Sequence, residues 1–329
     1  MDWEGKSLRI GTVAIVCAVL LRLIGGISAD GLSLLTGQKT MTALLFLSTG
    51  RVVRPVESTL PTQAPPETVE TEPLATEPPP LPVFADSDVS LVQVNSLCGY
   101  QPDVSALLVQ PLSWDLTQEA PTVLIVHTHG SESYQPTGGY KESSPYRTLD
   151  VGYNVVSVGD RLVQILQEGG VGVVHDRSIH DSPSYNNAYN NSREAVADYL
   201  ERYPSIRLVL DIHRDSVSDT NGNQVRFVAD VEGETTAQLM LVVGTDAGGL
   251  THPDWTENMS LAVKLHAQLE KNAPGICRPI GVRSYRYNQD LSAGALIVEV
   301  GSAGNTRQEA MLAVEQLGQA VLDLCRGTG

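Results

Sequence analysis

The stretch VLIVHTHGSESY, residues 123–134, carries the pattern that decides the fold. Its first four residues form a short apolar run, as in a buried strand, and polar residues follow at once. Four more short apolar runs occur at 171–174, 208–210, 239–243 and 295–300. Between most of these runs, apolar residues recur every three or four positions, which is typical of an amphipathic helix. Strands that alternate with such helices predict a mostly parallel central sheet with helices on both faces, a three-layer α/β/α sandwich.

The expected helices are marked by this spacing and by capping residues. Thr306 and Glu309 have the spacing of a capping box, in which each side chain bonds the backbone N–H of the other residue. The helices are expected at 154–165, 191–201, 254–271 and 306–321. In a parallel sheet, ligand sites lie beyond the carboxyl ends of the strands, so the residues that follow each apolar run are the candidates for chemistry.

The N-terminal residues predict a membrane anchor. Residues 8–27 (LRIGTVAIVCAVLLRLIGGI) are almost all apolar or small, and about 20 such residues span the hydrocarbon core of a bilayer. Basic residues at the start of this stretch favour an orientation with the remainder of the chain outside the cytoplasm. Two alternatives are a signal peptide cleaved near the small residues 26–29, and a longer apolar region that includes 41–47. We expect a cytoplasmic stub and retained anchor within 1–30, followed by a membrane-proximal segment, 31–53.

Residues 54–85 predict an extended spacer. They contain nine prolines and five glutamates, together with many threonines. A segment of this composition cannot bury enough apolar surface to offset the entropy of ordering it, and its prolines favour extended conformations. The spacer therefore separates the anchor from one globular domain, residues 86–329, which we expect to work outside the cytoplasm as part of a single-pass membrane protein.

Charge and cysteine content exclude other classes of function. The net charge is −16, with 38 acidic and 22 basic residues, so binding to nucleic-acid phosphates is not expected. Among the four cysteines, no pair has the CxxC spacing of a thiolate zinc site. A disulfide such as Cys277–Cys325 and buried free thiols both stay open.

The loop after residues 123–126 contains the first candidate site residues. His129 and Glu132 have the spacing HxxE, which lets one short loop offer an imidazole nitrogen and a carboxylate to the same point. Zinc accepts both types of ligand. His127, at the end of the apolar run, is an alternative ligand or a residue that contacts the substrate.

Two further candidates follow or occupy apolar runs. His213, in RLVLDIHRDS, is the expected third ligand, and a neighbouring acid is placed to orient its second ring nitrogen. The alternative is a charged loop held together by ion pairs. Glu299 lies inside the apolar run GALIVEVG, where an unpaired acid is costly. It is the expected base for a metal-activated water, unless it pairs with an arginine from 283–290.

Polar loops supply the remaining candidates. Arg214, directly after His213, and Arg286 are candidates to steady the reaction intermediate or to hold a substrate carboxylate. Asn288 is a candidate contact with the substrate. The polar residues of 173–192 are expected mainly to stiffen a loop, since sequences rich in Asn, Asp and Ser commonly form turns.

Six ordered motifs resemble the stage II sporulation protein P family. The similarity extends over about residues 120–325, and the anchor and spacer match the layout of the family. The motifs are HTHGSESY (127–134), DVGYNVVSVGDRL (150–162), VVHDRSIHD (173–181), VLDIHRDS (209–216), WTENMSLAVKL (255–265) and RYNQDLSAGALIVEVGSAGNT (286–306).

This resemblance implies a fold and an activity. The fold would be akin to zinc N-acetylmuramoyl-L-alanine amidases and zinc carboxypeptidases. The activity would be cleavage of the amide between the glycan and the stem peptide of peptidoglycan, with an associated endopeptidase activity, at the forming spore's septum. The partners would be stage II sporulation proteins D and M.

Residue by residue, the resemblance implies zinc ligands at His129, Glu132 and His213, with Glu299 as the catalytic acid. Asp150 is a rival ligand, because related amidases place an acid just before the equivalent helix. A zinc peptidase that acts on wall peptides and a non-catalytic wall-binding scaffold are the alternative functions.

Overall fold

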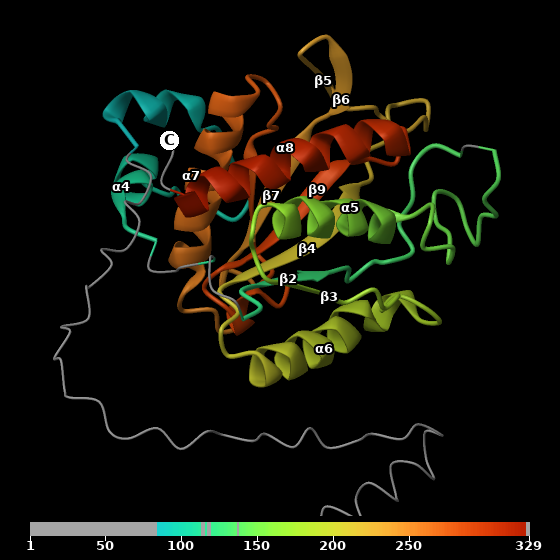
Figure 1. The fold of residues 1–329 in the computed structure, drawn as a ribbon, viewed down its shortest axis with the longest axis horizontal. Coiled ribbons are helices and arrows are strands. Elements are labelled where there is room, and N and C mark those ends of the chain that lie inside the picture. Colours follow the sequence, from blue (N-terminus) through green and yellow to red (C-terminus); the bar gives the residue numbers. More distant parts are fainter. Residues whose placement is uncertain (1–83, 113–115, 117–119, 137, 327–329) are drawn as a thin grey trace, which may run out of the picture. The chain divides into compact units, whose positions relative to one another are not determined.

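The computed structural model describes residues 84–112, 116, 120–136 and 138–326 (Figure 1). The expected anchor, the membrane-proximal segment and nearly all of the spacer lie outside these residues. Among the described helices, none is both long enough and apolar enough to span a membrane.

One mixed sheet of seven strands forms the centre of the described region, in the order β1-β8-β7-β9-β4-β2-β3. Five of the six neighbouring pairs are parallel, and only β7 and β9 are antiparallel. The strands are β1 (Val94–Ser96), β2 (Val123–Val126), β3 (Val173–His175), β4 (Leu208–Asp215), β7 (Leu239–Gly244), β8 (Ile280–Arg283) and β9 (Ala295–Ser302). The predicted mostly parallel sheet is therefore confirmed, but its two halves run in opposite directions.

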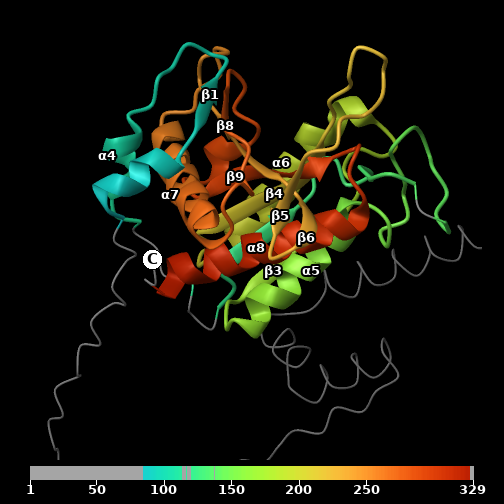
Figure 2. The same cartoon turned by 90° about the horizontal axis from the view of Figure 1, so that it is seen from above.

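Helices cover both faces of this sheet. Figure 1 shows α5, α7 and α8 on one face and α6 on the other, and Figure 2 shows the first three side by side. A short helix, α4 (Val104–Val109), packs against α7. The four long helices are α5 (Val155–Glu168), α6 (Ala188–Arg202), α7 (Trp255–Asn272) and α8 (Arg307–Arg326). The hairpin of β5 (Val228–Val231) and β6 (Glu234–Ala237) completes the β structure, and 3-10 turns lie at Asp86–Leu91, Tyr185–Asn187 and Gln289–Leu291.

Alternate residues of a strand pack on opposite faces of the sheet, so the hydrophobic core has a part on each face. Val123 and Ile125 of β2 pack with the cluster that includes α5, α7 and α8, whereas Leu124 and Val126 pack with Val196 of α6. Successive residues of a strand point to opposite faces, so these contacts also fix the direction of the polar residues that follow β2.

The starts of α5 and α8 agree with the sequence. The Asn154 side chain accepts a bond from Val156 N at 3.0 Å and so caps α5. At α8, Thr306 Oγ1 accepts from Glu309 N at 3.2 Å, and Glu309 Oε2 accepts from Thr306 N at 3.3 Å. The predicted capping box is thus confirmed.

Candidate active site at the carboxyl ends of β2, β4 and β9

The three neighbouring strands β9, β4 and β2 run parallel, so their carboxyl ends meet at one edge of the sheet. The loop after β2 carries His129 and Glu132, the end of β4 carries His213, and β9 carries Glu299. His213 and Glu299 are direct partners in the β4–β9 ladder. The structure therefore brings together the four residues that the sequence selects.

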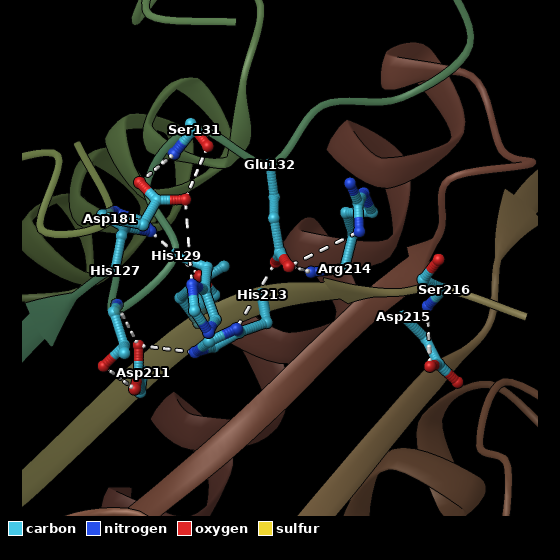
Figure 3. Close-up of polar contacts among 12 residues, drawn as sticks. His127, His129, Ser131, Glu132, Asp181, Asp211, His213, Arg214, Asp215 and Ser216 are labelled. Carbon is cyan, nitrogen blue, oxygen red and sulfur yellow. Dashed lines mark hydrogen bonds and ion pairs between the residues drawn. The ribbon is translucent and has the colours of Figure 1, made fainter. Parts of the chain in front are cut away.

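His213 lies buried between two carboxylates, on opposite sides of its ring (Figure 3). Its Nδ1 is 3.4 Å from Glu132 Oε2, and its Nε2 is 3.0 Å from Asp211 Oδ1. The Nε2 contact is too poorly aligned to count as a hydrogen bond, so this atom has no hydrogen-bond partner. Burial opposes the charged imidazole, but Asp211 and Glu132 outweigh burial and raise the pKa of His213 well above its usual value.

Glu132 is held as an anion. Burial favours its neutral form, but the Arg214 guanidinium and His213 outweigh burial and lower the pKa of Glu132. Arg214 Nη1 and Arg147 Nη2 lie 3.4 Å and 3.3 Å from Glu132 Oε1, and the backbone N–H of Arg214 donates to Oε2 at 3.2 Å. These contacts fix the position of the Glu132 carboxylate next to His213.

Glu299 has the opposite electrostatic environment. Its Oε2 is buried without a hydrogen-bond partner. Burial raises the pKa of Glu299 to about 8, although the nearby His213 opposes this rise. A carboxyl with a pKa near neutrality is suited to take up and return a proton.

His129 is packed among aromatic rings. It stacks on Tyr185 with centroids 4.4 Å apart and meets Tyr189 edge-on at 5.6 Å. The rings of His129 and His213 are 5.5 Å apart. Its Nδ1 is buried without a hydrogen-bond partner and faces Asp181 Oδ2 at 3.7 Å.

His127 does not join this group. It is fully buried against α5, where its Nδ1 contacts the Ile212 carbonyl at 3.1 Å and its Nε2 contacts His175 Nε2 at 2.9 Å. Burial lowers the pKa of His127 to about 3, so this imidazole is neutral. Like Ile125, His127 points to the α5 face, so it is not placed to contact a substrate beside His129.

Two other candidates have structural partners elsewhere. Asp150 is exposed, and its Oδ1 accepts from Gly152 N at 3.0 Å, so it is not beside His213. Arg286 donates to the Thr251 carbonyl at 3.1 Å and pairs with Asp290 at 3.2 Å.

Asn288 and Arg214 hold loops in place. Asn288 Nδ2 donates to the Tyr189 carbonyl at 2.8 Å, which ties its loop to α6. The Arg214 guanidinium donates to the carbonyls of Ser133 at 2.8 Å and Tyr146 at 2.7 Å, besides its pair with Glu132. The side chain of Arg214 is buried, so its donors serve the protein rather than a substrate.

The site also contains residues that the sequence did not select. Asp181, from the loop after β3, and Arg147, from the loop before α5, form an ion pair of 2.7 Å. The guanidinium of Arg147 also lies 4.7 Å above the ring of Tyr185. The sequence signal for Asp181 was weak, because SIHDSPSYNN resembles a turn-rich loop.

A zinc ion fits the chemistry of this donor set, two imidazoles and a carboxylate. The 3.4 Å between His213 Nδ1 and Glu132 Oε2 is close to the roughly 3.3 Å that separates two ligand atoms of one tetrahedral zinc ion. In the described part of the chain, no three or more His, Cys, Asp or Glu side chains are arranged as a group that could hold a metal ion. The fit therefore rests on the donor types and on the Glu132–His213 spacing.

Comparison with known proteins identifies relatives of the chain. A family model described as Stage II sporulation protein P matches residues 61–322. The stage II sporulation protein P of Bacillus subtilis (strain 168) is 31% identical over 206 residues, which make up 59% of this chain and 48% of that protein. The chain thus matches about half the length of this relative.

Solved structures with low sequence identity also resemble the chain. They are N-acetylmuramoyl-L-alanine amidase AmiC2 of Nostoc punctiforme (16% identity, 62% of this chain and 94% of that chain, TM-score 0.37), the amidase Ami1 from Mycobacterium smegmatis (17%, 64% and 96%, TM-score 0.38) and the CwlD amidase from Clostridioides difficile in complex with the GerS lipoprotein (11%, 61% and 94%, TM-score 0.37). Because the family model covers most of the sequence, the chain belongs to the stage II sporulation protein P family.

Proposed function

We propose that the chain is a zinc-dependent peptidoglycan hydrolase that cleaves the amide bond between N-acetylmuramic acid and L-alanine during sporulation. The observation that carries this proposal is the position of Glu299, whose pKa is raised to about 8, directly opposite His213. A proton-transferring carboxyl beside a set of metal donors is the arrangement that metal-assisted amide hydrolysis requires. Membership of a sporulation family supports the biological setting.

His129, Glu132 and His213 would hold the zinc ion. When bound, zinc polarises the scissile carbonyl and lowers the pKa of a bound water. Arg214 keeps the Glu132 carboxylate ionised, and Arg147 and Arg214 together hold it in place, as metal ligation requires.

Glu299 would transfer the proton. It accepts the proton of the attacking water and returns it to the departing amine of the stem peptide. Tyr185 is 53% exposed beside His129, so its exposed part is available to a sugar ring or a peptide of the substrate.

We further propose that the protein is anchored in the membrane, with residues 86–329 acting outside the cytoplasm. The apolar stretch 8–27 and the proline-rich stretch 54–85 support this layout. The reaction would then contribute to thinning of the septal wall and to engulfment, with stage II sporulation proteins D and M as partners.

Digestion of purified cell wall by the purified full chain tests the proposal. Wild-type protein should release intact stem peptides with a free N-terminal alanine, lose this activity when zinc is chelated, and regain it when zinc is returned. Glu299→Ala should retain zinc and lose at least about 10²-fold in turnover, the low end of general acid–base contributions.

Other products would replace the proposal with an alternative. Peptides cut internally, with the link to the glycan intact, would identify a zinc peptidase. Binding to the wall without cleavage, even after zinc is restored, would identify a scaffold.

A further inference from the structure

A buried carboxylate lies behind His129 and has no part in the proton transfer described above. Asp181 Oδ2 is 3.7 Å from Nδ1 of His129, the ring nitrogen that has no hydrogen-bond partner. Asp181 is 7% exposed, so its charge is largely removed from water. A buried charge is costly unless other groups stabilise it, so its partners indicate its role.

Three donors fix the position of Asp181. Its Oδ1 accepts from the backbone N–H of Ser131 at 3.1 Å, and its Oδ2 accepts from Ser131 Oγ at 2.5 Å and Arg147 Nη1 at 2.7 Å. The Arg147 guanidinium, 2.7 Å away, and the hydrogen bonds from Ser131 all favour the ionised carboxylate. The carboxylate is thus ionised and held in one orientation that faces His129.

The same arrangement occurs a second time in the site. Asp211 faces His213 Nε2 at 3.0 Å, and it accepts from the backbone N–H of Thr128 at 2.8 Å and from Thr128 Oγ1 at 2.6 Å. The loop after β2 therefore supplies one hydroxyl residue to each aspartate, and each aspartate faces one histidine. Because this aspartate–histidine arrangement occurs twice in one site, we infer that both aspartates have the same role.

Metal-binding histidines commonly donate their second ring N–H to a carboxylate, which fixes both the tautomer and the orientation of the ring. We propose that Asp181 is a positioning residue for His129: its carboxylate faces Nδ1, stabilises the Nδ1–H tautomer electrostatically and so leaves Nε2 as the nitrogen that binds the metal. For zinc binding, this inference rests on the proposed function. The predicted tautomer of His129, however, can be measured without any metal.

The tautomer is the primary test. We would label the full-length, metal-free chain with 15N in its seven histidines and determine the protonated nitrogen of His129 by NMR. The proposal expects the Nδ1–H tautomer in the wild type and a mixture in Asp181→Asn. A wild-type Nε2–H tautomer, or an unchanged tautomer in Asp181→Asn, would overturn it.

Zinc affinity is the second measurement. Loss of a carboxylate partner typically weakens metal binding by about 10–100-fold, which we expect for Asp181→Asn. Asp176→Asn is a matched control, because Asp176 is buried in the same loop and pairs with His180 at 2.8 Å, away from the donor set. This control should bind zinc like the wild type, and an equal loss in both variants would contradict the proposal.

The variant Arg147→Met tests whether Asp181 orients His129 directly or only holds Arg147 in place. We expect Arg147→Met to keep the Nδ1–H tautomer. If it shifts the tautomer and weakens zinc binding as much as Asp181→Asn does, Asp181 acts through Arg147 and the proposal fails. A wild type that binds no zinc would reject the proposed function, and the tautomer would still decide the role of Asp181.

Discussion

Glu299 and His213 face each other in the parallel ladder between β9 and β4, and the pKa values of both groups are raised, for different reasons. His213 is close to two carboxylates, so its pKa rises and the imidazolium persists. Glu299 has a buried oxygen without a hydrogen-bond partner, so its pKa rises and the neutral acid persists. Both groups therefore retain a proton in the metal-free site near neutral pH.

This pair predicts a specific dependence of stability on pH. Because the folded pKa of Glu299, about 8, lies above its ordinary value of 4.5, the stability it contributes is complete below about pH 4.5 and is lost as pH rises through 8. As pH rises from about 5 to 8, the free energy of unfolding should therefore fall less in metal-free Glu299→Gln than in the metal-free wild type. The difference should be on the order of a few kcal/mol. Urea unfolding of both metal-free proteins across this range measures the difference, and parallel pH profiles would contradict the assignment.

The set of metal donors is tested by direct metal analysis. His213→Ala and Glu132→Gln each remove a donor, so both should lose most of the bound zinc and the wall-digesting activity. Asp150→Asn should retain wild-type zinc content, because Asp150 is exposed and bonds to Gly152 N. Loss of zinc in Asp150→Asn but not in Glu132→Gln would reverse the assignment of these two acids.

Tyr185 is expected to affect substrate binding rather than folding. Its ring is half exposed, so Tyr185→Ala should destabilise the fold only by the lost ring contacts, about 0.5–1.5 kcal/mol for an aromatic pair. The KM for soluble wall fragments should rise. Tyr285→Ala is a suitable control, since Tyr285 is 67% exposed and has no ring contact with His129 or Tyr189 among the described residues. Equal effects on KM in both variants would show that Tyr185 has no specific role.

Gly294→Ala should strongly destabilise the domain. A Cβ at this position would lie 1.8 Å from the Arg207 carbonyl oxygen, and the Gly294 carbonyl accepts a bond from Val209 N at 2.9 Å. Since the backbone of β4 cannot move away without breaking this ladder, we expect a loss of about 1–3 kcal/mol or more. Thermal unfolding measures the loss, with Gly138→Ala as the control because its Cβ would meet nothing within 4 Å. A similar melting temperature for both variants would contradict this expectation.

Much of the fold and of the site could be predicted from sequence, because both depend on where apolar runs end. His213 and Glu299 were identified in this way, and the spacing of His129 to Glu132 correctly placed both on one loop. The direction of β7 could not be predicted, since an apolar run such as LMLVV looks the same in a parallel or an antiparallel strand. Asp181 could not be selected either, because its partners come from residues 34 and 50 positions away along the chain.

The central position of β9 determines when the sheet can form during synthesis of the chain. β9 joins β7 to β4, so without it the sheet separates into β1-β8-β7 and β4-β2-β3, with no ladder between the two parts. The same strand carries Glu299, and it is the last of the described strands along the sequence. A chain whose synthesis stops before Ala295 has neither a continuous sheet nor the carboxyl proposed to transfer the proton. If the proposed function holds, the protein is therefore inactive toward the cell wall until β9 has been made.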